Sequence, residues 1–151
     1  PDLEKPLHSG PELDLHVPAL IPEDYMPDVH LRLVLYKRIA AAADGEALGE
    51  LEAEMIDRFG PLQAPTQHLF RITRLKLRAA RLGLKRLEVG PLGGLVEFGE
   101  QHSVDPKVVL KLVQKEPKTW RLDGQAKLRF TGRYESEDAR CKAADALLAQ
   151  L

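Results

Sequence analysis

Two rows of charged side chains, each at helical spacing, have the clearest potential for chemistry. The acidic row consists of Glu46, Glu50, Glu54 and Asp57, which follow one another four, four and three residues apart. Neighbouring like charges at these spacings cost about 0.2–0.5 kcal/mol per pair in an isolated helix, and an acid in the last turn adds to that cost. The acidic row therefore indicates either a solvated face that tolerates the cost or a face that meets positive charge on another surface.

The basic row has the opposite sign and lies on the next expected helix. A row of this kind is typical of a phosphate-binding face, but no flanking aromatic side chains for base stacking accompany it. The alternative is that its guanidinium groups lie against acids of the same domain. The row consists of Arg71, Arg74, Arg78 and Arg81 and is followed by Lys85 and Arg86.

The sequence lacks the spacings that catalytic and metal sites show. No histidine stands at ligand spacing from another histidine or from Cys141, and the glycines of residues 90–94 lack the lysine of a phosphate-binding loop. We therefore expect no catalytic residue, no metal ligand and no cofactor in this domain, and we expect Cys141 to be a small core or boundary residue. The histidines are His8, His16, His30, His68 and His102.

Length and composition favour one compact domain. The chain has 151 residues, of which 44% are hydrophobic, and its net charge is −1, so no overall attraction to nucleic acid is expected. A single cysteine excludes an internal disulfide and favours the reducing cytoplasm. No apolar run reaches the roughly 20 residues that span a bilayer. We expect a linker over residues 1–12, where prolines and a glycine recur, and one domain over residues 13–151.

Hydrophobic periodicity predicts strands and helices in a mixed order. Residues 13–17 alternate as a short strand, the proline-punctuated residues 18–27 are extended, and three helices follow over 28–43, 46–59 and 65–82. On the first of these helices, Val29, Leu33, Tyr36, Ala40 and Ala43 mark the expected buried stripe.

Two hairpins and two more helices are predicted after residue 83. The hairpins cover residues 84–98 and 120–130, a helix opens at Asp105-Pro106, and Ser136 caps the last helix. Hairpins pair antiparallel, so we predict an α+β fold with a small, mainly antiparallel sheet packed against about five helices.

Several long motifs resemble one bacterial family. They are PALIPEDYMPDVHLRLVLYKRI at residues 18–39, EMIDRFG at 54–60, GGLVEF at 93–98 and WRLDG at 120–124. Together they resemble the C-terminal domain of the transcription-repair coupling factors, over residues 13–130. The first dozen residues and the last helix match weakly.

The resemblance implies a regulatory role within a larger protein. Members of the family are DNA translocases that use ATP and Mg²⁺ in other domains to remove stalled RNA polymerase from double-stranded DNA. They recruit the repair protein UvrA through an N-terminal UvrB-like module. The C-terminal domain is expected to cover the UvrA-binding surface of that module, in competition with UvrA, and to be neither an enzyme nor a membrane protein.

This resemblance gives the acidic row a role. We predict that Glu54 and Asp57, assisted by Glu50, accept salt bridges from arginines of the UvrB-like module. The alternative function is an accessory nucleic-acid-binding module that uses Arg71, Arg74, Arg78 and Arg81.

Overall fold

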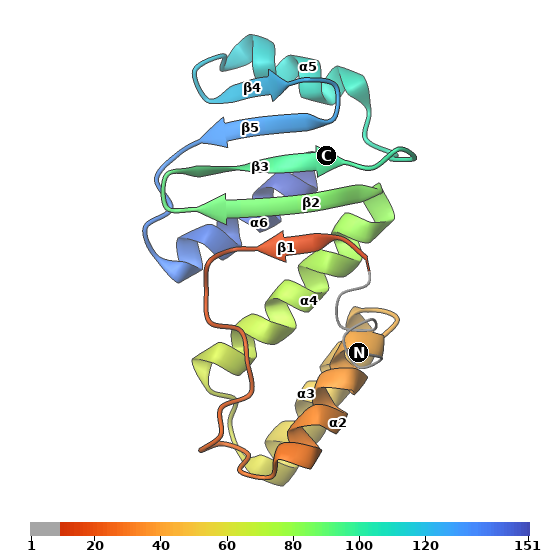
Figure 1. Cartoon of the computed structure of the whole chain (residues 1–151), viewed down its shortest axis with the longest axis vertical. Helices are drawn as coiled ribbons and strands as arrows, with labels where there is room; N and C mark the ends of the chain where they lie inside the picture. Colours follow the sequence, from red (N-terminus) through yellow and green to blue (C-terminus); the bar gives the residue numbers. More distant parts are fainter. Residues whose placement is uncertain (1–9) are drawn as a thin grey trace. The chain divides into compact units, whose positions relative to one another are not determined.

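The computed structural model describes residues 10–151, which divide into two compact units (Figure 1). The helical unit contains Val17–Leu77, and the sheet unit contains Gly10–His16 together with Arg78–Leu151. The helical unit is thus inserted in the sequence between the first strand and the rest of the sheet unit. Most of the linker expected over residues 1–12 lies outside the described residues, and its last residue belongs to a strand.

The helical unit is built from α2 (Val29–Ala41), α3 (Gly45–Phe59) and the first part of α4 (Ala64–Leu82). Asp28 and Asp44 cap α2 and α3, because their carboxylates accept hydrogen bonds from backbone N–H groups of the first turns. Gly60 ends α3 with a φ of 93°, a backbone conformation that favours glycine.

The buried stripe of α2 differs from the predicted one. Leu35 and Ile39 are buried, whereas Val29 and Leu33 are 60% and 42% exposed. Apolar residues lie on nearly all sides of this helix, so spacing alone does not select a face, and packing against the other core residues decides it. The core consists of Ile21, Met26, Leu35, Ile39, Leu48, Leu51, Met55, Leu62 and Phe70.

The proline-punctuated segment is fixed to the helices by side-chain hydrogen bonds. The N–H of Ile21 donates to the Tyr36 hydroxyl at 2.7 Å, and the Tyr25 hydroxyl donates to the carbonyl of Gly60 at 2.8 Å. These bonds satisfy backbone groups that prolines and loops leave without regular partners.

The sheet unit contains a five-stranded sheet in the order β1-β2-β3-β5-β4. Both predicted hairpins are confirmed, and only β1 pairs in parallel, so the predicted α+β class with a mainly antiparallel sheet is confirmed. Within the described residues five helices accompany it, two of which, α5 (Pro106–Lys115) and α6 (Glu137–Gln150), lie wholly in this unit. The strands are β1 (Glu12–Asp14), β2 (Leu84–Gly90), β3 (Gly93–Phe98), β4 (Trp120–Asp123) and β5 (Lys127–Thr131).

The first strand is shorter than predicted. It was expected over residues 13–17, but it begins at Glu12 and ends at Asp14. The reason is His16, whose φ of 54° is incompatible with extended backbone.

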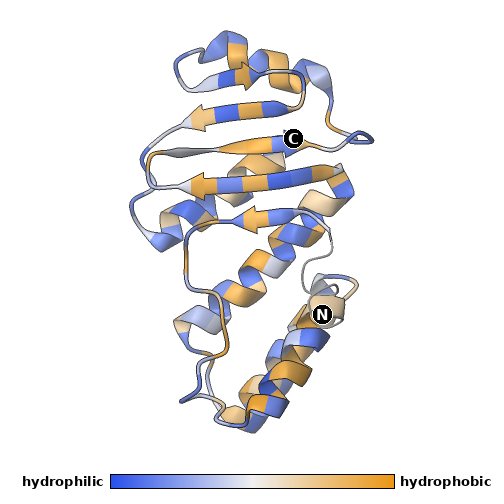
Figure 2. Ribbon diagram, in the orientation of Figure 1, coloured by the Kyte–Doolittle hydropathy of each residue, from blue (hydrophilic) through white to orange (hydrophobic). Residues whose placement is uncertain are grey.

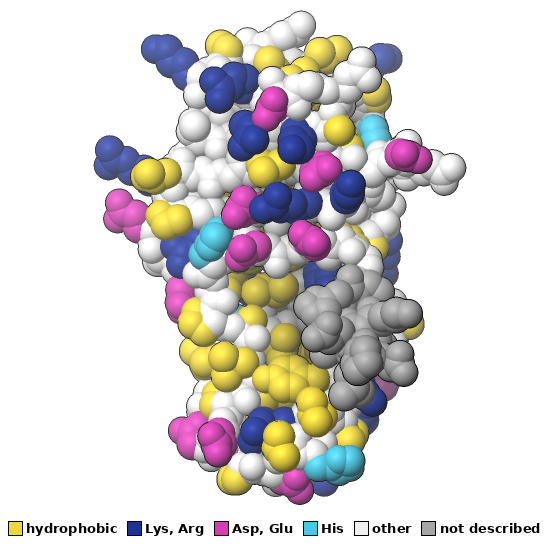
Figure 3. Space-filling view, in the orientation of Figure 1, with side chains coloured by type: hydrophobic (Ala, Val, Ile, Leu, Met, Phe, Trp, Pro, Cys, Tyr) yellow, Lys and Arg dark blue, Asp and Glu magenta, His cyan; other side chains and the backbone are white. Residues whose placement is uncertain are grey.

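The sheet has two chemically different faces. Apolar and polar residues alternate along its strands (Figure 2), and the apolar side chains of Leu87, Val96 and Leu128 are fully buried. On α6, Cys141 and Leu147 are buried, as expected for a small core cysteine. Charged side chains gather on the other face, which Figure 3 shows.

Arg140 of α6 binds two segments of the sheet unit together. It is 7% exposed, and its guanidinium donates hydrogen bonds of 2.8–3.2 Å to four backbone carbonyls, at Leu15, His16, Tyr134 and Glu135. The turn after β1 and the segment before α6 therefore share one buried donor group.

Replacement of Arg140 by Ala should destabilise the chain by about 3 kcal/mol, because buried carbonyls lose their donors. Arg140→Lys should rescue little, since an ammonium group cannot match the planar array of donors. Chemical denaturation measures both values. Arg133→Ala, at an exposed arginine of the same segment, is the control and should change stability by less than about 0.5 kcal/mol. Equal stabilities for the Arg140→Ala and Arg133→Ala variants would contradict this role.

Candidate interaction surface

The acidic row lies mostly on the solvent side of α3. Glu46, Glu50 and Asp57 are exposed, whereas Leu48, Leu51 and Met55 on the other side of the helix are buried. Burial of the apolar side fixes the rotation of the helix, so the carboxylates have to face outward.

Glu54 differs from its neighbours because it is already paired. Its carboxylate accepts two hydrogen bonds from Arg38 of α2, at 2.7 and 2.9 Å, and one from Arg58 at 3.5 Å. The hydrogen bonds from Arg38 hold the pKa of the Glu54 carboxyl below its usual value, and the charge of Arg58 adds to the effect. One of the three predicted contact residues therefore has its charge balanced within the helical unit.

Glu50 and Asp57 remain as exposed carboxylates of the predicted contact. Neither makes an ion pair with any residue between 10 and 151. They are seven residues apart, which places them about 10 Å from each other along the helix axis. Ala53 and Ile56 are also exposed on α3, and Ile56 is 46% exposed. This side of α3 thus combines two unbalanced negative charges with a small apolar area.

A recess of about 390 Å³ lies beside Glu50 and Glu54, between α2 and α3. Three alanines line it together with the two carboxylates and Arg38. A long basic side chain fits such a recess, since its aliphatic stem contacts the alanines while its charged end reaches the carboxylates. The lining residues are Arg38, Ala41, Ala42, Ala47, Glu50, Leu51 and Glu54.

Sequence reasoning missed Arg38 and Ile56. Arg38 is on a different helix from Glu54, and no spacing rule reports a contact between helices. Ile56 lies outside the apolar spacing of Leu48, Leu51 and Met55, and that departure was a readable signal of an exposed apolar residue.

Two of the four arginines of the basic row are paired with acids of the same chain. Arg74 pairs with Glu52 in the helical unit, and Arg78 donates to Asp145 at 2.6 Å in the sheet unit. The alternative that this row lies against acids of its own domain is therefore confirmed for these two arginines. Arg71 is half-buried and Arg81 is exposed.

No helix in the described part of the chain is long and apolar enough to cross a membrane.

Comparison with known sequences identifies close relatives. Residues 15–109 match the TRCF domain family. The chain is 43% identical over 130 residues to the transcription-repair-coupling factor of Escherichia coli K12, covering 86% of this chain and 11% of that protein. It is 44% identical to the Haemophilus influenzae protein of the same name, with the same coverage, and 40% identical to that of Myxococcus xanthus, over 78% of this chain and 10% of the relative. The chain thus spans about a tenth of the length of these relatives.

A solved structure has the same fold. The crystal structure of the C-terminal domain of a transcription-repair coupling factor superposes with a TM-score of 0.71, at 22% identity, and the match covers 93% of each chain.

Replacement of Arg38 by Gln should raise the pKa of the Glu54 carboxyl towards its ordinary value, because the main donors to the carboxylate are lost. A lowered folded-state pKa means that the pair stabilises the fold above the unfolded pKa and that this effect disappears as pH falls through the folded pKa. NMR titration of the Glu54 side chain measures the shift. Arg58→Gln is the matched control and should raise the pKa less; an equal rise would contradict the dominance of Arg38.

Proposed function

The chain belongs to the transcription-repair coupling factor family, and from this membership we propose that it is an autoinhibitory domain that docks on the UvrB-like module of its parent protein. Docking covers the surface to which UvrA binds, so that UvrA and this domain compete. The domain itself carries out no chemistry. In this proposal, ATP-driven translocation, with its Mg²⁺, and the binding of RNA polymerase and double-stranded DNA belong to other domains of the parent.

The observation that carries the proposal is the pair of exposed carboxylates, Glu50 and Asp57, on α3. Glu50 lies one helical turn from the like charge of Glu46, and Asp57 lies in the last turn of α3, where a negative charge is unfavourable. Residues 10–151 supply no cation that pairs with either carboxylate. Arginines on the UvrB-like module would provide that balance and would form directional, charge-assisted hydrogen bonds.

Glu54 takes a secondary part in this contact. Because Arg38 already holds its carboxylate with two hydrogen bonds, an incoming arginine has to share or displace that partner. The proposed order of importance is therefore Asp57 and Glu50 first and Glu54 second, which refines the assignment made from the sequence.

The energetics suit a reversible contact. Exposed ion pairs contribute about 0.2–1 kcal/mol each, so two of them with Ala53 and Ile56 produce a modest docking energy. A ligand that binds the undocked state of the parent protein a few kcal/mol more tightly than the docked state then shifts the equilibrium towards the undocked state. A contact that buried a large apolar area would bind too tightly for a ligand preference of this size to release it.

The pairing of the basic row disfavours the alternative, an accessory nucleic-acid-binding module. Arg74 and Arg78 are engaged with Glu52 and Asp145, which leaves fewer charges for phosphate contacts. Phosphate binding by this row would require these ion pairs to break first.

Reversal of both charges, in Glu50→Lys with Asp57→Lys, should weaken binding of this domain to the isolated UvrB-like module by about tenfold or more, since two pairs become repulsions. In the full-length parent, the same double variant should bind UvrA more tightly. Isothermal titration calorimetry measures the first effect and a UvrA pull-down the second.

The matched control reverses Glu23 and Asp24, two exposed acids of the same unit, and changes the net charge by the same amount. It should leave both readouts at the wild-type level. The contact assignment is wrong if the α3 variant and this control behave alike.

Docking should weaken steadily as salt rises from about 0.05 to 0.5 M, because exposed pairs are screened. The isolated chain, titrated with a short duplex DNA over the same salt range, should show no comparable salt-steep binding. Tight DNA binding that Arg71→Ala and Arg81→Ala abolish would instead support the nucleic-acid module.

A further inference from the structure

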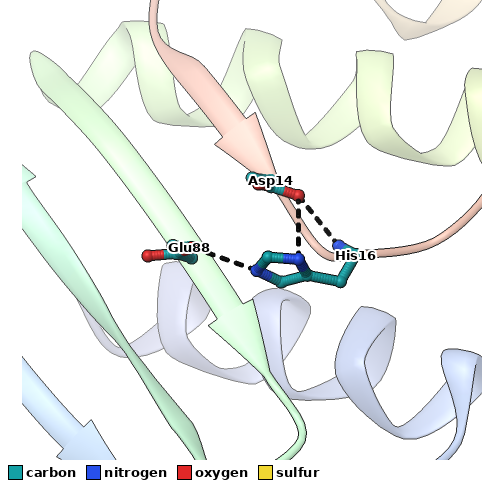
Figure 4. A group of neighbouring side chains, drawn as sticks. All are labelled: Asp14, His16 and Glu88. Carbon is teal, nitrogen blue, oxygen red and sulfur yellow. Dashed lines mark hydrogen bonds and ion pairs between the residues drawn. The ribbon is translucent and has the colours of Figure 1, made fainter.

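The sheet unit brings together three side chains whose atoms suit a metal ion. Asp14 ends β1, His16 follows it, and Glu88 lies on β2 (Figure 4). One donor atom from each of the three lies within 4.8 Å of the others. We propose that these residues form a binding site for one divalent cation of the zinc class, with water in the remaining coordination positions.

Contact distances show that little rearrangement is needed. The Nε2 atom of His16 is 3.0 Å from an oxygen of Glu88, and Nδ1 is 3.7 Å from an oxygen of Asp14. Zinc lies about 2.0–2.2 Å from nitrogen and oxygen ligands, so two ligands of one tetrahedral ion are about 3.3 Å apart. A small opening of the His16–Glu88 contact admits the ion between these two side chains.

Asp14 completes the arrangement from the other side of the ring. A metal-binding histidine usually donates its second N–H to a carboxylate, which fixes the orientation of the ring. Asp14 has the position for that contact and, after rotation of its side chain, for direct ligation. The backbone N–H of His16 also donates to Asp14 at 3.0 Å, so the carboxylate is already held beside the ring.

The strand register places both carboxylates on the same face of the sheet. Asp14 and Glu88 are direct partners in the parallel pairing of β1 with β2. One oxygen of Glu88 is 3.4 Å from Arg86, and the other faces His16 at 3.0 Å. The oxygen beside His16 is therefore the one that an ion would bind.

The backbone fixes His16 in place. Its φ of 54° is uncommon for a residue other than glycine, and its carbonyl accepts a hydrogen bond of 3.2 Å from the buried Arg140. The backbone of residue 16 is thus held, and the ring itself is oriented by its 3.0 Å contact with Glu88.

The donor set selects the class of cation. One imidazole and two carboxylates match Zn²⁺ and its transition-metal neighbours, whereas Ca²⁺ and Mg²⁺ prefer sites made of oxygen atoms alone. The His16 and Asp14 side chains are 46% and 56% exposed, so the ion and its water ligands have access from solvent. This inference is independent of docking, since all three residues belong to the sheet unit.

Titration of the whole chain with Zn²⁺, monitored by isothermal titration calorimetry, tests the site. We expect one Zn²⁺ per chain, a higher unfolding temperature with zinc, and no competition from millimolar Mg²⁺. His16→Asn should lower zinc affinity at least tenfold, and asparagine tolerates the left-handed backbone of residue 16. Glu88→Gln should lower it similarly while it preserves the size of the side chain.

His30→Asn is the matched control, because His30 is exposed on α2 and belongs to no such cluster among residues 10–151. It should bind zinc as the wild type does. NMR spectra of the histidine rings should show the His16 resonances shifting on zinc addition. The proposal is overturned if Zn²⁺ shows no saturable binding below about 0.1 mM, or if His16→Asn and Glu88→Gln bind it as tightly as the wild type.

Discussion

Burial of the apolar side of α3 is the constraint from which the properties of the helical unit follow. Leu48 and Met55 are completely buried, and Leu51 is nearly so, which fixes the rotation of the helix about its axis. With that rotation fixed, Glu46, Glu50 and Asp57 have no choice of environment and must face water or a partner. The fold and the proposed docking therefore depend on the same three side chains, since their burial is what holds the carboxylates outward.

Much of the fold could be predicted from the sequence because it is encoded locally. Helix caps at Asp28 and Asp44, the end of α3 at Gly60 and both hairpins depend on residues within a few positions of each other. The buried face of α2 was not predictable, because that helix is apolar nearly all round and only its neighbours select Leu35 and Ile39.

The candidate sites divide in the same way. The exposure of Glu50 and Asp57 follows from helical periodicity and was predictable. The contacts of Glu54 with Arg38, 16 residues away, and of His16 with Glu88, 72 residues away, depend on how elements pack, which no spacing rule reports. The parallel pairing of β1 with β2 could not be predicted from local sequence patterns either, since the whole helical unit separates those strands in the sequence.

The acidic and basic rows look alike in the sequence, because each is a run of like charges at helical spacing. In the structure they differ in where the opposite charges lie. Arg74 and Arg78 pair with carboxylates of their own chain, so the basic row contributes to the fold. The acidic row is divided: Glu54 pairs with Arg38, while Glu50 and Asp57 find no cation within residues 10–151. A repulsive arrangement that the fold itself leaves unbalanced is more informative about a partner than a charged row in general. Because Arg38 balances Glu54, the unbalanced charge of the row lies on Glu46 in the first turn and on Glu50 and Asp57 further along α3. A charge in the first turn is favoured by the helix itself, so Glu50 and Asp57 are the two that an external arginine would stabilise most.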